Sequence, residues 1–145
     1  MQELETYELL AYIAGFLDGE GCFSIAKCDG RQRSHARVTV ANTDQNVLLF
    51  IQYKLKDFDI ESRISSNMHR CRGHEKQCWA LEINNSCIGK LCLLLRPYLI
   101  VKHNQAEIVS KFVDLRNKEG KYGCNYGLEE ELLYKQLKLL NHRGL

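Results

Sequence analysis

The run from Tyr12 to Gly21, YIAGFLDGEG, constrains the fold of this chain more than any other feature. Its apolar residues recur at helical spacing, and a strand-like run follows it at once. Small residues lie along the same helix at Ala11, Ala14, Gly15 and Gly19. Because each helix-interior glycine costs roughly 1 kcal/mol relative to alanine, close approach of a second helix is the usual reason for such glycines. The run therefore predicts a helix that packs tightly on a twin and ends beside a sheet.

The length and composition indicate one globular domain spanning residues 1–145. Hydrophobic residues make up 45% of the chain and charged residues 26%, which suits a protein with an ordinary core. No apolar run approaches the ~20 residues that span a bilayer, and the acidic start of the chain lacks the basic region of a secretory signal. We therefore expect an intracellular protein without a membrane partner. The net charge of +2 favours a nucleic-acid partner only weakly.

Seven cysteines, an odd number without any CxxC pair, indicate reduced thiols rather than a disulfide framework. Cys22, Cys87 and Cys92 lie in apolar runs, where we expect them to be buried. A further group has the ligand types of tetrahedral zinc, but its spacing matches no closed finger pattern: His69, Cys71, His74 and Cys78. A basic loop with incidental thiols is the simpler explanation, and the sequence leaves zinc open.

Periodicity predicts an α+β domain in which helices cover one face of a four-stranded antiparallel sheet. The helical patterns cover residues 7–19, 44–57, 86–95, 103–117 and 128–142. The strand patterns cover residues 22–28, 35–42, 60–67 and 78–84. The last helix begins with acidic residues and ends with basic ones, which matches the helix dipole. We expect its leucine stripe to pack on the back of the domain.

Side chains alternate along the predicted strands between an aliphatic face and a small, polar or basic face. In the second strand, Val38 and Val40 alternate with Arg37 and Thr39. A half-solvated antiparallel sheet explains this alternation without any ligand. The tips of the two predicted hairpins are basic, however, and favour a nucleic acid on the polar face. One tip carries Arg31, Arg33 and His35, and the other carries Arg70, Arg72, His74 and Lys76.

The run Ile13–Gly21 resembles the signature of the LAGLIDADG homing endonucleases. Asp18 stands at the first aspartate of that signature and Glu20 at the second, where glutamate keeps the charge and the metal-binding chemistry although its extra methylene moves the carboxylate. The predicted order α-β-β-α-β-β-α also agrees with the fold of this family, so the resemblance extends across nearly the whole chain. For the run by itself, the alternative is a buried amphipathic helix with a glycine C-cap.

The resemblance implies a site-specific endonuclease that cuts double-stranded DNA at a long, pseudo-palindromic site. Because the chain carries one motif, a single active site requires a homodimer whose two-fold axis runs between two Ile13–Gly21 helices. At this interface we place Ala11, Ala14, Gly15, Asp18 and Gly19.

In this family the open face of the sheet forms a saddle along the DNA major groove. An arginine there can pair with guanine and an asparagine with adenine, but one sequence does not tell base contacts from phosphate contacts. The resemblance makes the following residues candidate DNA contacts: Ser24, Lys27, Arg31, Arg33, His35, Arg37, Thr39, Arg63, Ser65, Asn67, Arg70, Arg72, Lys76, Glu82 and Asn84.

The same resemblance assigns catalytic roles to Glu20, Lys102 and Asp44. Glu20 and Gly19 would bind Mg²⁺, a hard cation that takes oxygen ligands, and we expect Ca²⁺ to support DNA binding without cleavage. Lys102 would stabilise charge on the phosphate, and Asp44 would help to organise solvent. Two of these residues have a plainer alternative: Lys102 as a solvated lysine at a helix start, and Asp44 as an N-cap. We expect Asp18 to cap or brace its helix end rather than to bind metal.

Two other functions fit the same resemblance. One is a LAGLIDADG-type RNA maturase that assists intron splicing, and the other is a non-catalytic dimeric DNA-binding regulator. The presence of Glu20 and Lys102 favours the nuclease, and the absence of splicing blocks from the sequence favours an intron-encoded, free-standing enzyme. The family occurs in mitochondria, chloroplasts, archaea and phage, and the sequence does not choose among these hosts.

Overall fold

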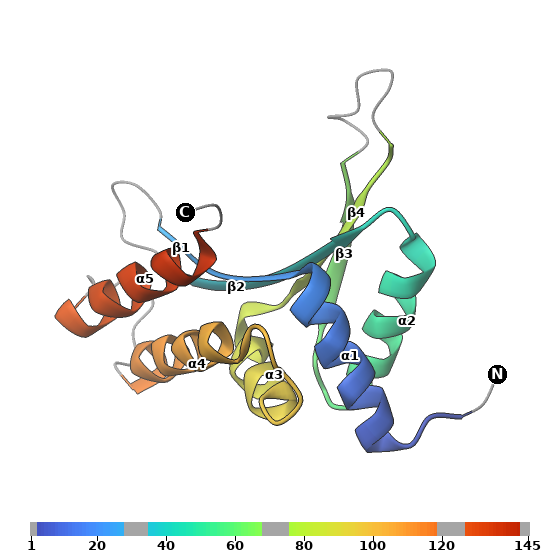
Figure 1. Cartoon of the computed structure of the whole chain (residues 1–145), viewed down its shortest axis with the longest axis horizontal. Coiled ribbons are helices and arrows are strands. Elements are labelled where there is room, and N and C mark those ends of the chain that lie inside the picture. The colour runs from blue at the N-terminus through green and yellow to red at the C-terminus, as the bar shows by residue number, and fades with distance from the viewer. Residues whose placement is uncertain (1–2, 28–34, 68–75, 119–126, 143–145) are drawn as a thin grey trace.

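The computed structural model describes residues 3–27, 35–67, 76–118 and 127–142 (Figure 1). The elements in chain order are α1 (Thr6–Glu20), β1 (Gly21–Ala26), β2 (His35–Asn42), α2 (Gln45–Lys56), β3 (Ser62–Ser66), β4 (Trp79–Ile83), the short 3-10 helix η2 (Asn85–Cys87), α3 (Ile88–Leu95), α4 (His103–Lys118) and α5 (Leu128–Asn141). The predicted order α-β-β-α-β-β-α is confirmed, and α4 and α5 extend it.

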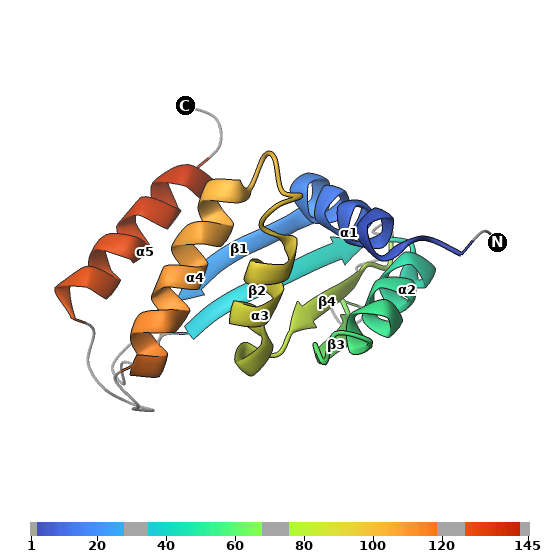
Figure 2. The ribbon, with the colours of Figure 1, turned by 90° about the horizontal axis from the view of Figure 1, so that it is seen from below.

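The four strands form one antiparallel sheet in the order β1-β2-β4-β3. Strand β2 pairs with β1 on one side and with β4 on the other, so the two α-β-β units meet at the centre of the sheet. The helices lie on one side of the sheet, and no helix of the described residues covers the other side (Figures 1 and 2). The fold therefore leaves an open sheet face.

Helix α1 passes into β1 without an intervening loop, because α1 ends at Glu20 and β1 begins at Gly21. The backbone N–H of Gly21 donates to the carbonyl oxygen of Leu17 and closes the helix. A Cβ on residue 21 would lie 2.6 Å from that oxygen, so the direct helix-to-strand turn requires glycine. Gly21 thereby sets where Glu20 lies relative to the sheet.

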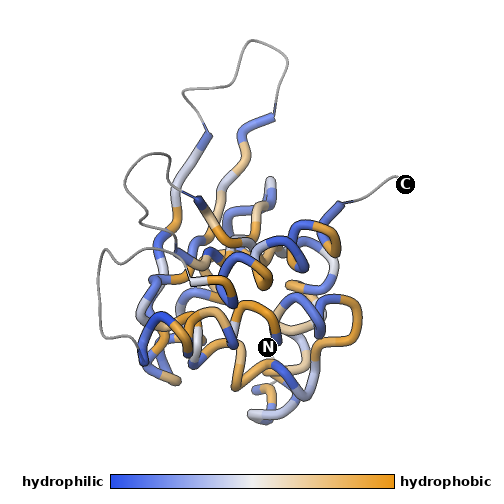
Figure 3. Tube along the Cα trace, turned by 90° about the vertical axis from the view of Figure 1, so that its left-hand side faces the viewer, coloured by the Kyte–Doolittle hydropathy of each residue, from blue (hydrophilic) through white to orange (hydrophobic). Residues whose placement is uncertain are grey.

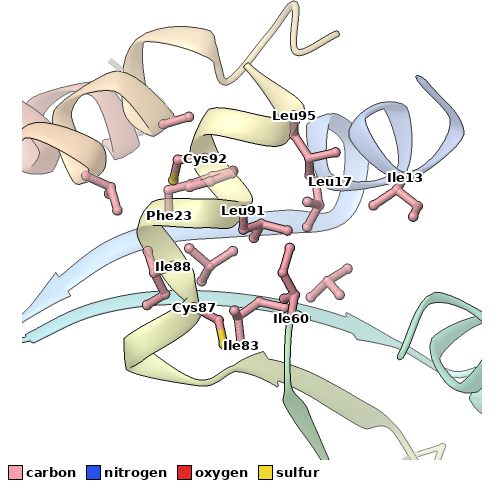
Figure 4. Packing of buried hydrophobic residues seen from close by; sticks show 14 of the residues in the cluster. Ile13, Leu17, Phe23, Ile60, Ile83, Cys87, Ile88, Leu91, Cys92 and Leu95 are labelled. Atoms are coloured by element: carbon pink, nitrogen blue, oxygen red, sulfur yellow. The ribbon is translucent and has the colours of Figure 1, made fainter. Parts of the chain in front are cut away.

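Alternate residues of the strands point toward the helices and form the core, as predicted. In β2, Val38 and Val40 are buried, whereas Arg37 and Thr39 are partly exposed. The inward residues join side chains from the helices in one apolar cluster. Figure 4 shows part of it, with Phe23 of β1 among side chains from α1 and α3.

Three predictions on cysteines have different outcomes. Cys87 and Cys92 are buried in the apolar cluster, as predicted. Burial raises the pKa of the Cys92 thiol to about 12, so this thiol stays protonated at neutral pH. The prediction for Cys22 is wrong, because Cys22 is exposed. Phe23 takes the inward position on β1, and the alternation of the strand turns Cys22 to the open face.

The last three helices pack side by side on the sheet, with α4 between α3 and α5 (Figure 2). Helix α5 also contacts β1. Its Leu137 side chain is buried, and the Asn141 Nδ2 atom donates to the carbonyl oxygen of Phe23 at 2.7 Å. The predicted packing of this helix on the back of the sheet is confirmed.

Hydrophobic and hydrophilic residues alternate over short distances along the trace (Figure 3). This is the pattern of helices and strands that each bury one face. Within the described ranges, no helix is both long enough and apolar enough to cross a membrane.

We expect Leu137→Ala to lower the free energy of unfolding by about 2–4 kcal/mol, because it leaves a cavity where α5 meets the domain. The matched control is Leu139→Ala on the same helix, where the side chain is 75% exposed. The control should change the free energy by less than about 0.5 kcal/mol. Urea unfolding measures both values, and equally small effects would show that α5 is not docked as described.

Candidate nucleic-acid interface and catalytic centre

The open face of the sheet is formed by the outward residues of all four strands. Their register places side chains in rows across the sheet, and one row runs through Cys22, Thr39, Glu82 and Arg63. The next row contains Ala41, Ala80 and Ser65. These side chains are small, polar or charged, as the alternation of the strands predicts.

An acidic side chain lies between two arginines on this face. Glu82 Oε1 lies 3.4 Å from Arg37 Nε, and Glu82 Oε2 lies 3.3 Å from Arg63 Nη2. The arginine side chains are 43% and 74% exposed, and that of Glu82 is 27% exposed. Ion pairs this exposed to solvent contribute about 0–1 kcal/mol to stability. Because the arginine side chains are exposed and only weakly held, both guanidinium groups remain accessible to a ligand on the open face.

The structure places most of the described candidate DNA contacts on or beside this face. The outward strand positions are Ser24, His35, Arg37, Thr39, Arg63, Ser65 and Glu82, and Lys76 and Asn84 are exposed next to the strands. Asn67 partly serves the fold, because its side-chain oxygen accepts from the backbone N–H of Cys78 at 2.7 Å. Four candidates lie outside the described residues: Arg31, Arg33, Arg70 and Arg72.

Lys27, another predicted DNA contact, lies beside α5. Its ammonium lies 2.8 Å from Glu131 Oε2 and 4.7 Å from the centre of the Tyr134 ring, both on α5. Helix α5 packs on the covered side of the sheet. The hydrogen bond from Lys27 also lowers the pKa of the Glu131 carboxyl. Lys27 therefore contacts α5, and its role as a DNA contact stays a prediction.

The C-terminal end of α1 carries the candidate catalytic acid. Glu20 is its last residue and is exposed, and the last turn of α1 contains no basic residue. A helix C-terminus carries partial negative charge, which disfavours a carboxylate there by roughly 0.3–1 kcal/mol. The position of Glu20 is therefore unfavourable for the helix alone and would become favourable with a cation bound.

Asp18 and Lys102 tie this helix end to the loop before α4. The Asp18 carboxylate accepts from the backbone N–H of Ile100 at 2.8 Å and from that of Lys102 at 3.0 Å. In return, Lys102 Nζ donates to the backbone carbonyl oxygen of Asp18 at 2.6 Å. We call these three hydrogen bonds the Asp18 bracket. The bracing role that the sequence offered for Asp18 is confirmed, and the solvated-lysine alternative for Lys102 is wrong, because its residue is only 5% exposed.

Asp44 has a defined structural role. It is the N-cap of α2, where its side chain accepts from the backbone N–H of Asn46 at 2.9 Å. Its own backbone N–H donates to Asn42 Oδ1 at 2.8 Å, which ends β2 and starts the helix. The capping alternative is confirmed, and a catalytic role for Asp44 stays a prediction.

The exposed side of α1 carries Ala11, Gly15 and Gly19. A Cβ built on either glycine would meet nothing within 4 Å, so nothing in the described single chain requires glycine there. Ala14 is different, because it is completely buried against the domain's own core. Its placement at a dimer interface was wrong, since residue 14 lies on the inward side of the helix.

Exposed apolar side chains also lie on the elements next to α1, and the sequence patterns did not single them out. Helix α1 lies between α2 and the loop that joins α3 to α4 (Figure 2). Tyr53 of α2 is exposed, and Ile100 and Val101 of the loop are 85% and 67% exposed. In the sequence, the adjacent apolar residues Ile100 and Val101 between Pro97 and a polar helix start could have indicated an exposed apolar surface.

The part of the chain that the structure describes holds no complete metal site. No three His, Cys, Asp or Glu side chains of these residues are grouped so that they could hold a metal ion. Of the possible zinc group, only Cys78 is described, and its thiol donates to the Trp79 carbonyl oxygen at 3.6 Å. His69, Cys71 and His74 lie outside the described residues. Among the described residues, Glu20 is therefore not part of a complete set of side-chain ligands.

We expect Asp18→Ala to lower the free energy of unfolding by about 1–3 kcal/mol, because it leaves two backbone N–H groups of the loop without their acceptor. Asp114→Ala, at an exposed position of α4, serves as the control and should have little effect. Urea unfolding of both variants measures the difference. A loss no larger than that of the control would mean that the Asp18 bracket does not stabilise the domain.

Comparison with known proteins agrees with this geometry. The family of LAGLIDADG-like domains matches residues 8–93, and no curated protein sequence matches the chain. The fold is similar to that of the archaeal intron-encoded homing endonuclease I-Vdi141I in complex with DNA, with a TM-score of 0.74 and 21% identity over 97% of this chain and 89% of that one. The group I intron-encoded homing endonuclease I-CeuI, also complexed with DNA, gives a TM-score of 0.65 and 18% identity over 94% and 69% of the two chains.

A third similar structure is the homing endonuclease I-CvuI in complex with DNA, with a TM-score of 0.55 and 22% identity over 92% of this chain and 94% of that one. At identities of this size, the structural similarity supports the assignment of the fold alone. The family match spans more than half of the chain and includes Ile13–Gly21 and all four strands. This chain therefore belongs to the LAGLIDADG-like domain family, and its fold is that of the LAGLIDADG homing endonucleases.

Proposed function

We propose that this protein is a site-specific DNA endonuclease that acts as a homodimer and requires a divalent metal ion, Mg²⁺ in the first place. The observation that carries the proposal is the exposed Glu20 carboxylate at the end of α1, beside an open polar sheet face. Relatives of the same fold, among them I-Vdi141I and I-CeuI, are homing endonucleases complexed with DNA.

The open face supports a DNA duplex as the ligand. It has no helix covering it in the described residues, and it presents arginine, hydroxyl and histidine side chains in regular rows. Arginine and lysine neutralise phosphates, and arginine in particular reads guanine in the major groove. Because a two-fold symmetric enzyme presents the same face twice, we infer that its site is pseudo-palindromic.

The stripe of small residues on the exposed side of α1 supports a homodimer. Ala11, Gly15 and Gly19 would let two α1 backbones approach closely, and nothing in the described part of one chain accounts for the two glycines. A two-fold axis along this stripe would also bring Ile100 and Val101 of one copy toward α2 of the other. The second copy would cover these exposed apolar side chains and would place the two Glu20 side chains together.

The donor atoms at the end of α1 fit a hard cation. The Glu20 carboxylate and the backbone carbonyl of Gly19 are oxygen donors, which Mg²⁺ and Ca²⁺ prefer. Since the described part of one chain has no complete ligand set, the second chain, the DNA phosphate and water would supply the rest. When bound, the metal would activate water and stabilise the leaving 3′ oxygen. Structures of I-CvuI in complex with DNA were obtained in the presence of Mg or of Ca.

Lys102 would act on the phosphate from the protein side. Its Nζ atom lies 2.6 Å from the carbonyl oxygen of Asp18, two residues before Glu20 in the sequence, so its positive charge is fixed at the same helix end. A fixed ammonium stabilises the negative charge that develops on a phosphate under attack without further reorganisation. The role of Asp44 in ordering solvent stays a prediction beside its capping role.

We expect Glu20→Gln to retain DNA binding and to reduce cleavage by about 100-fold or more, because the amide keeps the size of the side chain but loses the charge of a metal ligand. A randomised duplex library with Mg²⁺, followed by sequencing of cut ends, measures cleavage for the wild type and the variant. Glu129→Gln, at an exposed position of α5, is the matched control and should cut like the wild type.

The outcomes of this experiment separate the functions. A two-fold related site cut by the wild type and by the control, but not by Glu20→Gln, supports the nuclease. Selective DNA binding without any cutting by the folded wild type would indicate a DNA-binding regulator instead. Loss of both binding and cleavage in Glu20→Gln would give Glu20 a role in folding or assembly and would contradict its catalytic assignment.

We expect Gly15→Leu to convert the dimer to a monomer while the fold is kept. A Cβ at residue 15 meets no atom of its own described chain within 4 Å, and leucine is a better helix former than glycine by about 1 kcal/mol. Between two closely packed helices the same side chain would clash. Sedimentation velocity measures the mass, and circular dichroism measures the fold. Asn117→Leu, at an exposed position of α4, is the control, and a dimeric Gly15→Leu protein would contradict the proposed interface.

A further inference from the structure

The position of Glu82 on the open face is unexpected for a surface that would bind DNA. It lies on β4, one of the two central strands, so it would face the duplex directly. A carboxylate there repels phosphates and reduces the electrostatic attraction on which binding depends. A carboxylate at this position would therefore need a second role that offsets its repulsion of the phosphates.

The two carboxylate oxygens of Glu82 each pair with a different arginine. Oε1 pairs with Arg37 Nε from β2, and Oε2 pairs with Arg63 Nη2 from β3, at 3.4 and 3.3 Å. The carboxylate thus bridges arginines from the strands on either side of β4. Stability does not explain this arrangement, because ion pairs this exposed contribute little.

The bridge leaves the arginines able to bind a base. Arg37 uses Nε for Glu82, and within the described part of the chain its terminal Nη atoms have no other ion-pair partner. A guanidinium needs two adjacent N–H groups to pair with O6 and N7 of guanine. A free arginine side chain loses rotamer freedom when it forms such a pair, whereas a side chain already held in place loses less.

The bridge lies across the sheet from the strand that follows the candidate catalytic residue. Glu82 shares a row with Thr39 and Cys22, and Cys22 is two residues after Glu20. Two residues along a strand span about 7 Å, and β4 lies two strands from β1, about 10 Å across the sheet. The bridge and the strand that follows Glu20 would therefore contact the same duplex on the open face.

We propose that Glu82 is a positioning residue that holds Arg37 and Arg63 in place to read guanine on the open face. The proposal rests on the proposed function and names a determinant of sequence specificity within it. Glu82 would therefore lower non-specific affinity for DNA and raise discrimination between base pairs.

Binding selection from a randomised duplex library tests this proposal. Every variant carries Glu20→Gln, so that no DNA is cut during the selection. The set comprises this parent and its derivatives with Arg37→Gln, Arg63→Gln, Glu82→Gln and Glu82→Asp. Asp114→Asn, an exposed acidic position of α4 away from the sheet, controls for the loss of one negative charge. Urea unfolding midpoints show whether each variant is folded.

We expect the parent to select guanine at defined positions and the two arginine variants to lose that preference. Glu82→Gln should weaken the preference at the same positions by up to about 5-fold, the most that an exposed ion pair supplies, whereas each arginine variant removes the larger contribution of an arginine–guanine pair. Its affinity for non-specific DNA should rise, because a negative charge leaves the face. Glu82→Asp should recover part of the preference, and Asp114→Asn should behave like the parent.

Three results would overturn the proposal. Glu82→Gln that is as selective as the parent would show that the arginines need no positioning. Loss of preference at a position that neither arginine variant affects would show that the carboxylate itself reads a base, as glutamate can read cytosine. A folded parent that binds DNA without any sequence preference would overturn this proposal together with the proposed function, which the other two results would leave intact.

Discussion

The Asp18 bracket is the interaction on which the functional arrangement depends. One carboxylate on α1 accepts from two backbone N–H groups of the loop that leads into α4, and the Lys102 ammonium donates back to the helix. N–H groups just before a helix have no partner within it, and a hydrogen bond to a charged group contributes roughly 1.5–3 kcal/mol. The bracket therefore makes one rigid unit of two segments, so that Glu20 and Lys102 are placed by the same contacts.

Charge is distributed unevenly between the end of α1 and the open sheet face. The end of α1 carries the Glu20 carboxylate and the negative end of the helix dipole, and the Lys102 ammonium is a cation bound beside them. The open sheet face presents Arg37 and Arg63, with Glu82 between them. Under the proposed function, the sheet would attract DNA phosphates, and a divalent cation at Glu20 would reduce the repulsion between that carboxylate and the phosphate.

Most of the fold followed from local patterns. The pattern at 103–117 became α4 at His103–Lys118, and that at 35–42 became β2 at His35–Asn42, because periodicity reports which face of an element is buried. The predictions that failed concern where a side chain points. Ala14 belongs to the buried side of a helix that has small residues on two sides, and Cys22 lies on the outward side of β1, where Phe23 takes the inward position. A small or weakly apolar residue fits either side of an element, so local spacing could not decide which side it occupies.

The sequence by itself determined the order of the elements, the aliphatic and polar faces of the sheet, and the placement of an acid at the end of the first helix. These features depend on backbone geometry and on residues within a few positions of one another. Only the tertiary structure decided that Asp18 holds residues 100–102 and that Glu82 joins Arg37 and Arg63. The physical reason is that such partners are brought together by the packing of the whole core, which no short stretch of sequence specifies.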